Sequence, residues 1–455
     1  MEVFKIIKQD NLIKGEIIDF SHDGKGVLKV DNFTIFAYGG LIGDIVEVKI
    51  EEIKRNYATG RVVRIIKPSK DRCQVDFQVD ESKGAIPLIE YDYLKQLDWK
   101  QEKVRKDLER IAGLDNVQVE KTIGMDTPFR YRNHTQIPVG KQKGRLEIGF
   151  YEINSRNIVD MEGSIIQPKI GDKILQLIRE WMKKFNISPY DRQKQKGLIR
   201  HIGIRTNKDG EAMVILVTSN HKLPNKKELI EELTKTNVVS IYQNINRKNW
   251  SVTYGKEYIK LYGQEKLTDY IGKFKFNLSP NSFFQVNRPQ AEVLYNKVVE
   301  YLDLDQEDIV YDLYSGIGTI SLFIANKVKK IYGIEMVKAA VEDAWENAEL
   351  NGVDNVEFIT GRAEKVFPAL LRKGIEANKL ILDPPRKGCE KEVLEAIIEL
   401  ESEKIAYVSC NPSTMARDVK YLVHNGYKVK EIQPVDLFPH TAHVETVVLM
   451  SRIEN

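Results

Sequence analysis

The segment Asp312-Leu313-Tyr314-Ser315-Gly316-Ile317-Gly318-Thr319-Ile320-Ser321 follows a short apolar run and leads into a helical pattern. Glycines at a turn between a strand and a helix let the backbone approach a ligand closely. Glu335 closes the next apolar run and lies 17 residues after Gly318, near the spacing of roughly 20 at which an acid binds ribose hydroxyls. The third glycine of a dinucleotide fingerprint is missing, because Ser321 stands there. This unit predicts a cofactor with an adenosine ribose and, taken alone, leaves NAD(H) and S-adenosylmethionine open.

The rest of the C-terminal part repeats the same kind of unit. Apolar runs alternate with helical stretches, and the runs lie at 309–313, 331–334, 356–359, 380–382 and 405–408. Such alternation predicts a mostly parallel sheet with helices on both faces, so we assign residues 271–455 to an α/β Rossmann-like domain. The carboxyl ends of parallel strands meet at one edge, where ligands bind. Asp383 and Cys410 follow the fourth and fifth runs, and we expect both beside the glycine turn.

Residues 1–69 read as a separate small unit. Five short strand patterns with turns between them fall within residues 11–67. Five strands in so short a stretch predict a closed barrel of the OB type, which often binds nucleic acid. A barrel that only packs on its neighbour would have the same pattern.

Residues 70–270 read as a central α+β domain. Helical spacing covers 95–111 and stops at Gly113, and an Asn207-Lys208-Asp209-Gly210 turn joins two strand patterns into a hairpin. Lys and Arg outnumber Asp and Glu by 27 to 16 in residues 121–270, although the net charge of the chain is only +3. This excess favours a polyanionic partner such as RNA, and a solvated basic surface would look alike.

The composition excludes several classes of protein. The chain has 455 residues, which suits several domains, and no apolar run approaches the roughly 18 residues of a membrane span. The N-terminus has no secretory signal pattern. The three cysteines, Cys73, Cys389 and Cys410, are far apart and odd in number, which fits a reducing cytoplasm. We therefore expect a cytoplasmic protein with no membrane contact.

Two further segments indicate covalent chemistry. Cys410 lies in Tyr407-Val408-Ser409-Cys410-Asn411-Pro412, and Glu445 ends Asp436-Leu437-Phe438-Pro439-His440-Thr441-Ala442-His443-Val444-Glu445. Carbon 5 of uracil is a poor nucleophile until a thiolate adds to carbon 6, and a base must later remove the proton from carbon 5. Cys410 is our candidate nucleophile and Glu445 our candidate proton acceptor. Cys389 has no such neighbours, so we expect a buried apolar residue.

These segments closely resemble the RNA (uracil-5-)-methyltransferase family over nearly the whole chain. The resemblance implies a TRAM barrel, a central domain and a class I methyltransferase domain that uses S-adenosylmethionine. It implies Cys410 as the nucleophile and Glu445 as the proton acceptor. It also implies four cofactor contacts, namely Gln285, Tyr314, Glu335 and Asp383, and a role for Arg386 in holding the catalytic loop or RNA.

The sequence departs from the family in two places. Ser315 stands in the glycine loop where the family usually has Cys, which should matter little because the loop supplies backbone shape. Many ribosomal-RNA members hold a [4Fe–4S] cluster through four cysteines. Here Cys73 alone remains, with 82–87 and 163–165 in the places of the others. One thiolate cannot hold such a cluster, so we expect no metal and no iron–sulfur cluster.

The barrel is a feature of the ribosomal-RNA branch, so the favoured substrate is 23S ribosomal RNA, methylated to 5-methyluridine by a monomeric enzyme. A transfer-RNA (uracil-5-)-methyltransferase is the alternative. The remaining rivals are a cytosine-5 methyltransferase, an adenine or guanine N-methyltransferase, a NAD-dependent dehydrogenase, and a non-catalytic RNA-binding or ribosome-assembly factor. Cytosine-5 methyltransferases typically place a catalytic Cys beside the Pro of the fourth-strand motif, and Asp383-Pro384-Pro385-Arg386 has none. An N-methyltransferase would not need Cys410, and a dehydrogenase is disfavoured by the missing third glycine and by the unexplained Cys410 and Glu445. The intact Cys410, Glu445 and Asp383 argue against the non-catalytic factor.

Overall fold

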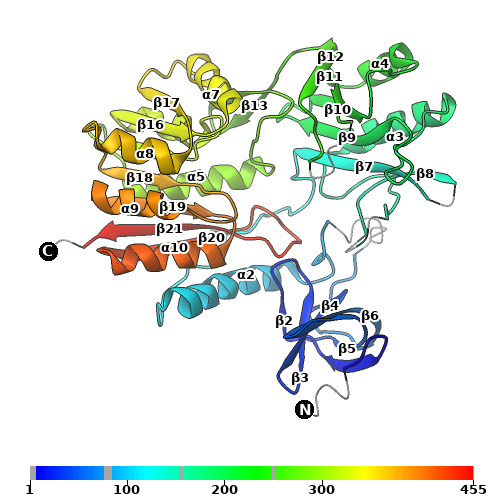
Figure 1. Cartoon of the computed structure of the whole chain (residues 1–455), viewed down its shortest axis with the longest axis horizontal. Coiled ribbons are helices and arrows are strands. Elements are labelled where there is room, and N and C mark those ends of the chain that lie inside the picture. Colours follow the sequence, from blue (N-terminus) through cyan, green and yellow to red (C-terminus); the bar gives the residue numbers. More distant parts are fainter. Residues whose placement is uncertain are drawn as a thin grey trace.

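The computed structural model describes residues 7–75, 85–142, 144–152, 155, 157–247 and 252–453. Within these ranges the chain forms a small N-terminal barrel, a central sheet with two helices and a C-terminal α/β sheet (Figure 1). The multidomain architecture that the sequence predicts is confirmed. The boundaries at residues 69 and 270 remain our proposal. No helix in the described part is both long and apolar enough to cross a membrane.

The N-terminal sheet curls into a barrel. In the order β1-β5-β6-β4-β3-β2, its strands are β1 (Leu12–Glu16), β5 (Ile45–Ile53), β6 (Tyr57–Lys67), β4 (Phe33–Tyr38), β3 (Gly26–Val30) and β2 (Asp19–Phe20). Only Ile17 and Ile18 separate β1 from β2, yet these strands stand at opposite edges of the order, so this bend brings the two edges together. The first strand pattern is therefore two strands. Buried aliphatic side chains such as Leu28, Ile35 and Val48 fill the interior.

The central sheet has helices on one face only. In the order β12-β11-β10-β9-β7-β8, its strands are β12 (Glu257–Gly263), β11 (Val238–Ile245), β10 (Ala212–Thr218), β9 (Ile199–Thr206), β7 (His134–Gln142) and β8 (Arg145–Ile148). The hairpin that the sequence predicts is β9–β10 and is confirmed. Helices α3 (Lys169–Lys184) and α4 (Lys226–Thr234) cover the face formed by Ile202, Ile204 and their neighbours. Side chains alternate along a strand, so the other face carries a different set of residues.

The C-terminal sheet is doubly wound. Its order is β17-β16-β15-β18-β19-β21-β20, with β15 (Ile309–Leu313), β16 (Lys330–Glu335), β17 (Val356–Thr360), β18 (Lys379–Leu382), β19 (Lys404–Ser409), β20 (Tyr427–Val435) and β21 (Glu445–Arg452). The first five in chain order are parallel, as predicted, and β21 runs antiparallel to β19 and β20. A two-stranded sheet, β13 (Leu267–Ile271) and β14 (Phe274–Leu278), leads into this domain.

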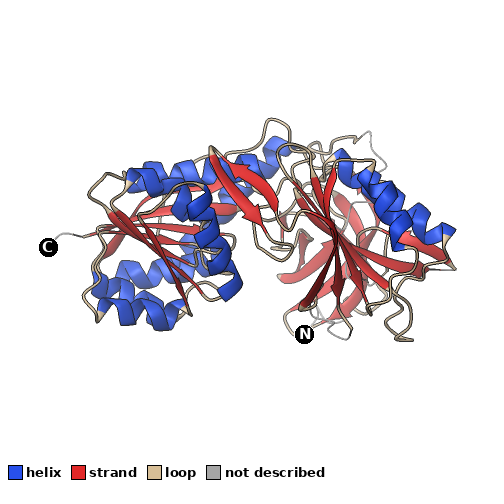
Figure 2. Cartoon of the chain, turned by 90° about the horizontal axis from the view of Figure 1, so that it is seen from above, coloured by secondary structure: helices blue, strands red, loops and turns tan. Residues whose placement is uncertain are grey.

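Helices cover both faces of this sheet (Figure 2). One face packs against α5 (Arg288–Leu302), α6 (Thr319–Ile324) and α7 (Lys338–Leu350). The other face packs against α8 (Ala363–Leu371), α9 (Lys391–Leu400) and α10 (Pro412–His424). The helix expected at 95–111 is α2 (Tyr93–Asp107) with a short extension to Ala112, and it packs beside α10 on this second face (Figure 1). It therefore lies against the C-terminal sheet, although its sequence lies in the range assigned to the central domain.

Candidate active site

One pocket opens at the carboxyl edge of the C-terminal sheet. Because β15 lies between β16 and β18, the winding of the chain reverses there, and ligands bind at such points. The pocket has a volume of about 690 Å³. All six residues expected in the site line it: Gln285, Tyr314, Glu335, Asp383, Cys410 and Glu445. We call it the active-site pocket.

The glycine turn after β15 forms one wall. Tyr314, Gly316 and Gly318 all have left-handed backbone angles, with φ of 71°, 57° and 80°. A Cβ atom at Gly316 would meet no atom within 4 Å, whereas at Gly318 it would lie 2.7 Å from the ring of Phe358. The first glycine therefore leaves the backbone open to a ligand, and the second allows α6 to begin close to the sheet.

Glu335 fixes the glycine turn from the end of the neighbouring strand. One carboxylate oxygen accepts from the backbone N–H of Gly316 (3.2 Å), and the other accepts from Val337 (2.7 Å). The Glu335 side chain thus links β16 to the turn after β15, in the position where an acid reaches a ribose.

Gln285 lies in the loop before α5. Its backbone carbonyl accepts from the side chain of Asn133 (3.0 Å), and the next residue accepts from the Asn133 N–H (2.8 Å). The side chain of Gln285 also hydrogen-bonds the Tyr295 hydroxyl, which lies 3.0 Å from the Thr319 hydroxyl. Gln285 is therefore held between the central sheet and the first turn of α6.

Cys410 stands between the end of β19 and the start of α10. Asn411 caps the helix, accepting from the Ser413 N–H (3.2 Å), and Pro412 is its first residue. The side chain of Asn411 also donates to the Arg386 carbonyl (2.9 Å), which joins this segment to the loop after β18. The partial positive charge of the helix N-terminus favours a thiolate at this point.

Glu445 lies beside Cys410 at the end of an antiparallel ladder. Ser409–Thr446 is the last pair of the β19–β21 ladder, and Cys410 and Glu445 are the residues directly beyond that pair. Both line the pocket, and the charge of Glu445 acts on the Cys410 thiol. The candidate nucleophile and the candidate base are therefore neighbours, which the sequence separation of 35 residues conceals.

Three carboxyl groups that line the pocket, those of Asp312, Asp383 and Glu445, have raised pKa values. Burial is the main cause in each case and raises the pKa of Asp312 and of Asp383 to about 7 and that of Glu445 to about 8. Nearby negative charge adds to the effect, since Asp312 acts on Asp383 and Asp383 acts on Glu445. The pocket thus holds protons near neutral pH and favours a positively charged ligand.

Burial also raises the pKa of the Cys410 thiol to about 11, with smaller contributions from the charges of Glu445 and Asp383. Arg386 acts in the opposite direction on both Cys410 and Glu445. Without a ligand, Cys410 is therefore a thiol at neutral pH. A bound cation lowers the pKa of the thiol, because it favours the ionised form.

The loop between β20 and β21 carries Phe438 and His443 into the pocket, and helix α2 holds this loop. Lys100 donates to Asp436 (2.5 Å) and to the Phe438 carbonyl (3.2 Å), and the Tyr93 hydroxyl donates to the other oxygen of Asp436 (2.8 Å). The Lys100 and Asp436 side chains are fully buried. The contact between this helix and the loop could not be predicted, because nothing in the pattern at 95–111 indicates which sheet the helix covers.

Two pocket carboxylates also escaped the sequence analysis. Asp312 is the second-last residue of β15, in an apolar run, and accepts from the N–H and hydroxyl of Ser321. Asp343 lies on the inner face of α7 and accepts from the hydroxyls of Ser279 (2.9 Å) and Ser282 (2.5 Å). In the sequence, only the place of Asp312 directly before the glycine turn could have indicated a role in the site. For Asp343 the sequence shows helical periodicity and nothing that indicates such a role.

The other two cysteines lie outside the pocket. Cys389 is buried in the core, as expected, and burial raises the pKa of its thiol to about 12. Cys73 is exposed. Residues 82–84, part of the segment that replaces two expected cluster ligands, lie outside the described residues. Within the described part of the chain, no group of three or more His, Cys, Asp or Glu side chains is arranged to hold a metal ion.

Comparison with known families gives two matches. The tRNA (uracil-5-)-methyltransferase family matches residues 93–453, and the TRAM domain matches residues 16–63. A Clostridium tetani (strain Massachusetts / E88) protein described as an uncharacterized RNA methyltransferase is 47% identical over 448 residues, covering 98% of this chain and 97% of the relative. A Bacillus cereus (strain ATCC 10987 / NRS 248) protein with the same description is 43% identical over 451 residues, covering 98% of each chain.

Among solved structures, the chain is similar to the Pyrococcus abyssi tRNA (uracil-54, C5)-methyltransferase in complex with S-adenosyl-L-homocysteine. The TM-score is 0.77 and the sequence identity is 28%, with 96% of this chain and 100% of that chain covered. The likeness therefore includes the barrel as well as the two larger parts.

Proposed function

The chain belongs to the tRNA (uracil-5-)-methyltransferase family, and we propose that it methylates carbon 5 of uracil in 23S ribosomal RNA through a covalent adduct with Cys410. It is an RNA uracil-5-methyltransferase that depends on S-adenosylmethionine. The observation that carries the covalent route is that Cys410 and Glu445 lie together directly beyond the last pair of the β19–β21 ladder, inside the same pocket as the glycine turn.

The pocket fits S-adenosylmethionine. The open backbone at Gly316 suits the close approach of a ligand, and Glu335 lies where a ribose would be held. Asp312 has one carboxylate oxygen that is buried without a hydrogen-bond partner among the described residues, and Asp383 lies near it. We assign cofactor binding to Gln285, Tyr314, Glu335 and Asp383. The cofactor, when bound, supplies an electrophilic methyl group beside buried carboxylates that favour its positive charge.

Cys410 and Glu445 would act in turn on the uracil. The Cys410 thiol first loses its proton to solvent, and the thiolate sulfur then adds to carbon 6, which forms an S–C bond and places nucleophilic density on carbon 5. Once carbon 5 carries the new methyl group, Glu445 accepts its proton, the double bond re-forms and the thiolate leaves. The raised pKa of Glu445, about 8, suits a group that must take up a proton near neutral pH. A paired uracil hides carbon 6, so the target base must be flipped out or unpaired.

Ribosomal RNA is our first substrate and transfer RNA the second. The TRAM barrel matches at residues 16–63, and the resemblance places that barrel with the ribosomal-RNA branch. The Pyrococcus abyssi relative is named for uracil 54 of transfer RNA and matches across the same length, which favours the second candidate. The three free cysteines suit a reducing compartment, and the cytoplasm is our proposed location.

Methyl transfer to defined RNA tests the proposal. Unmodified 23S ribosomal RNA and transfer RNA transcripts would be offered separately with labelled S-adenosylmethionine, and the product nucleoside identified by mass spectrometry. Wild type should form 5-methyluridine in 23S RNA, and Cys410→Ser should lower the rate by on the order of 10³-fold or more. Cys73→Ser, at an exposed cysteine, is the matched control and should retain full activity.

Each of the other outcomes would revise a separate part of the proposed function. Label in transfer RNA alone would overturn the substrate and keep the chemistry. Full activity in Cys410→Ser would overturn the covalent route. Binding of S-adenosylhomocysteine without transfer to either RNA would overturn the proposed substrate class.

A further inference from the structure

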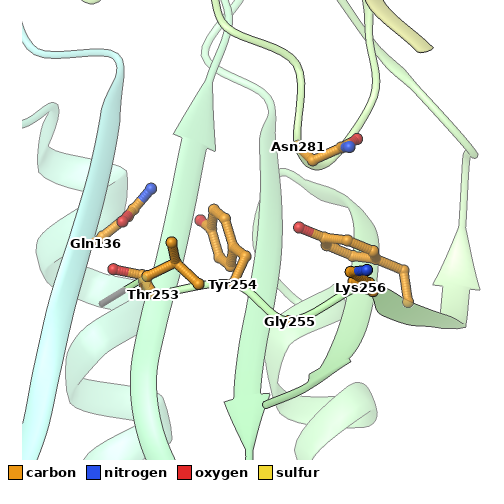
Figure 3. A pocket seen from close by; sticks show the side chains of 8 residues that line it. Gln136, Thr253, Tyr254, Gly255, Lys256 and Asn281 are labelled. Atoms are coloured by element: carbon orange, nitrogen blue, oxygen red, sulfur yellow. The ribbon is translucent and has the colours of Figure 1, made fainter. Parts of the chain in front are cut away.

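A second hollow lies on the helix-free face of the central sheet (Figure 3). Its walls are Gln136 of β7, residues 252–256 of the loop before β12, Tyr258 of β12 and Asn281 of the loop leading to the active site. The volume is about 590 Å³. We call it the sheet pocket. It contains amide, aromatic and lysine side chains and no carboxylate.

The sheet pocket and the active-site pocket share wall residues. Asn281 lines both directly. A third hollow, which we call the connecting hollow, shares Gln136 with the sheet pocket and shares Arg386, Phe438 and His443 with the active-site pocket. The sheet pocket therefore lies close to the place where a target base would enter the active-site pocket.

The aromatic rings of the sheet pocket are held in a row. The rings of Tyr254 and His134 are nearly parallel with centres 6.3 Å apart, and the ring centres of Tyr254 and Tyr258 are 6.1 Å apart. The Tyr254 hydroxyl hydrogen-bonds His134 (3.1 Å) and the side chain of Gln136. Gly203 makes room for this ring, because a Cβ atom there would lie 2.3 Å from the Tyr254 hydroxyl. In Figure 3 the Tyr254 ring lies between Gln136 and Asn281.

Several polar groups in and beneath this row have no partner. The Tyr258 hydroxyl is buried and makes no hydrogen bond to any described residue. Arg205 of β9 is only 1% exposed and faces the same side as Gly203, and its Nε and Nη1 groups likewise find no partner in the described part. Its other nitrogen donates to the Ser282 carbonyl (2.6 Å), beside Asn281.

The charge of Arg205 is not cancelled by an ion pair among the described residues. The two nearby carboxylates, Asp269 and Asp343, are already engaged by Arg288 and Lys266. Lys256 at the rim is exposed and also lacks an ion pair within the described residues. Positive potential from a buried and an exposed cation, next to flat rings, attracts a phosphate and a base together.

We propose that the sheet pocket binds one unpaired nucleotide of the RNA substrate that flanks the target uridine. The base lies against Tyr254 and Tyr258, the amides of Gln136 and Asn281 meet its edge, and the phosphate lies beside Lys256. This assignment rests on the proposed function, because it takes RNA as the substrate whose target base enters the active-site pocket.

Measuring how tightly variants of the sheet pocket bind RNA tests the proposed nucleotide site. Lys256→Glu and Tyr258→Leu would be compared with wild type for binding of 23S ribosomal RNA and transfer RNA transcripts on filters, at several salt concentrations. The dissociation constant should rise about five- to 100-fold for each variant. The slope of log affinity against log salt should fall by about one for Lys256→Glu. Lys227→Glu, an exposed charge reversal on α4 at the opposite face, should leave both unchanged.

Binding of S-adenosylhomocysteine, measured by calorimetry, should be unaltered in every variant and reports that each protein is folded. Gln136→Ala, at an exposed residue, replaces Tyr258→Leu if the latter does not fold. Photocrosslinking with 4-thiouridine-containing RNA should label the tryptic peptide 257–260, which carries Tyr258.

If Lys256→Glu and Tyr258→Leu both bind RNA as tightly as the wild type, the proposal that the sheet pocket binds a nucleotide is overturned. This holds even if the wild-type enzyme transfers methyl normally. A wild type that binds RNA without transferring methyl would overturn the proposed function, and the affinity comparison would still decide the sheet pocket. A wild type that binds neither RNA would overturn both.

Discussion

Glu445 is a single residue whose two neighbours define its role. It is 5% exposed, stands at the first position of β21 and lies beside Cys410 at the end of the ladder. Burial, helped by the charge of Asp383, raises the pKa of Glu445 to about 8. A carboxylate with this pKa binds a proton readily near neutral pH. Replacing Glu445 should therefore slow removal of the carbon-5 proton more than the first addition of Cys410 to carbon 6.

Glu445→Gln should therefore trap the enzyme on RNA. The amide keeps the shape of the side chain but cannot take the proton from carbon 5, so methylated RNA should stay attached to Cys410. Turnover should fall about 10²- to 10⁴-fold. The measurement is a labelled RNA–protein band that survives denaturing electrophoresis. Adding Cys410→Ser should abolish the band, and a band that persists in the double variant would contradict the assignment.

At this scale the sequence predicted some site residues and not others. The places of Asp383 and Cys410 beside the glycine turn follow from position, because each directly follows a parallel strand. Glu445 was indicated by the need for a base that removes the proton from carbon 5, and Gln285 came from the family resemblance alone. Arg205 and Asp343 were out of reach, because a charged residue within a strand or helix pattern shows its importance only when its neighbours are known.

Helix α2 is the element whose role is clearest from the fold. Its Lys100–Asp436 pair holds the loop that brings Phe438, His443 and Glu445 to the pocket. Helical spacing predicted the helix and its end at Gly113, which has a left-handed φ of 72°. Its packing partner lies more than 300 residues away in sequence, so periodicity could not identify it. The barrel shows a related limit, since one strand pattern became β1 and β2 by bending at Ile17 and Ile18.

Lys100→Met should destabilise the protein strongly. Removing one member of a fully buried ion pair leaves the other charge uncompensated, which costs about 3–5 kcal/mol of unfolding free energy. Methyl transfer should also slow, because the loop loses its anchor. Urea unfolding gives the free energy. Lys106→Met, on an exposed turn of the same helix, should stay within about 0.5 kcal/mol of wild type.

Pairing that change with Asp436→Asn separates charge from packing. The amide oxygen still accepts from Tyr93, and no charge remains buried, so the double variant should be more stable than Lys100→Met alone. Equal stability of the two would show that the buried charge is not the cause.

Across the whole molecule, buried acids and buried imidazoles make the free energy of unfolding depend on pH in opposite directions. His440 and His443 have pKa values lowered to about 4, mainly by burial, so their contribution rises between pH 4 and 6.5 and is complete above that. Asp312, Asp383 and Glu445 have raised pKa values, so the folded chain holds more protons than the unfolded chain up to pH 7–8. Their contribution therefore falls as pH rises through that window.

Above pH 6.5 the contribution of the two imidazoles no longer changes, so stability without ligand should decline from pH 6.5 toward pH 8.5. Glu445→Gln should remove about 2 kcal/mol of this decline, because Glu445 alone accounts for roughly 1.4 kcal/mol per pH unit up to its pKa. Urea unfolding at pH 5.5, 6.5, 7.5 and 8.5 measures the curve. A wild type whose stability rises between pH 6.5 and 8.5 would show that the carboxyl groups do not hold protons as described.

The position of α2 also limits how the parts can be exchanged. On this helix Trp99 donates to Asp19 of the barrel (2.7 Å), and the next residue, Lys100, holds the loop at Asp436. Phe20 and Leu41 of the barrel share a buried cluster with Trp99 and with Ala442 of that same loop. A chimera that swaps residues 1–69 alone would set a foreign barrel against a native helix. An exchange that keeps the barrel together with this helix must therefore extend through Gly113, and it must also match the loop at Asp436 that Lys100 holds.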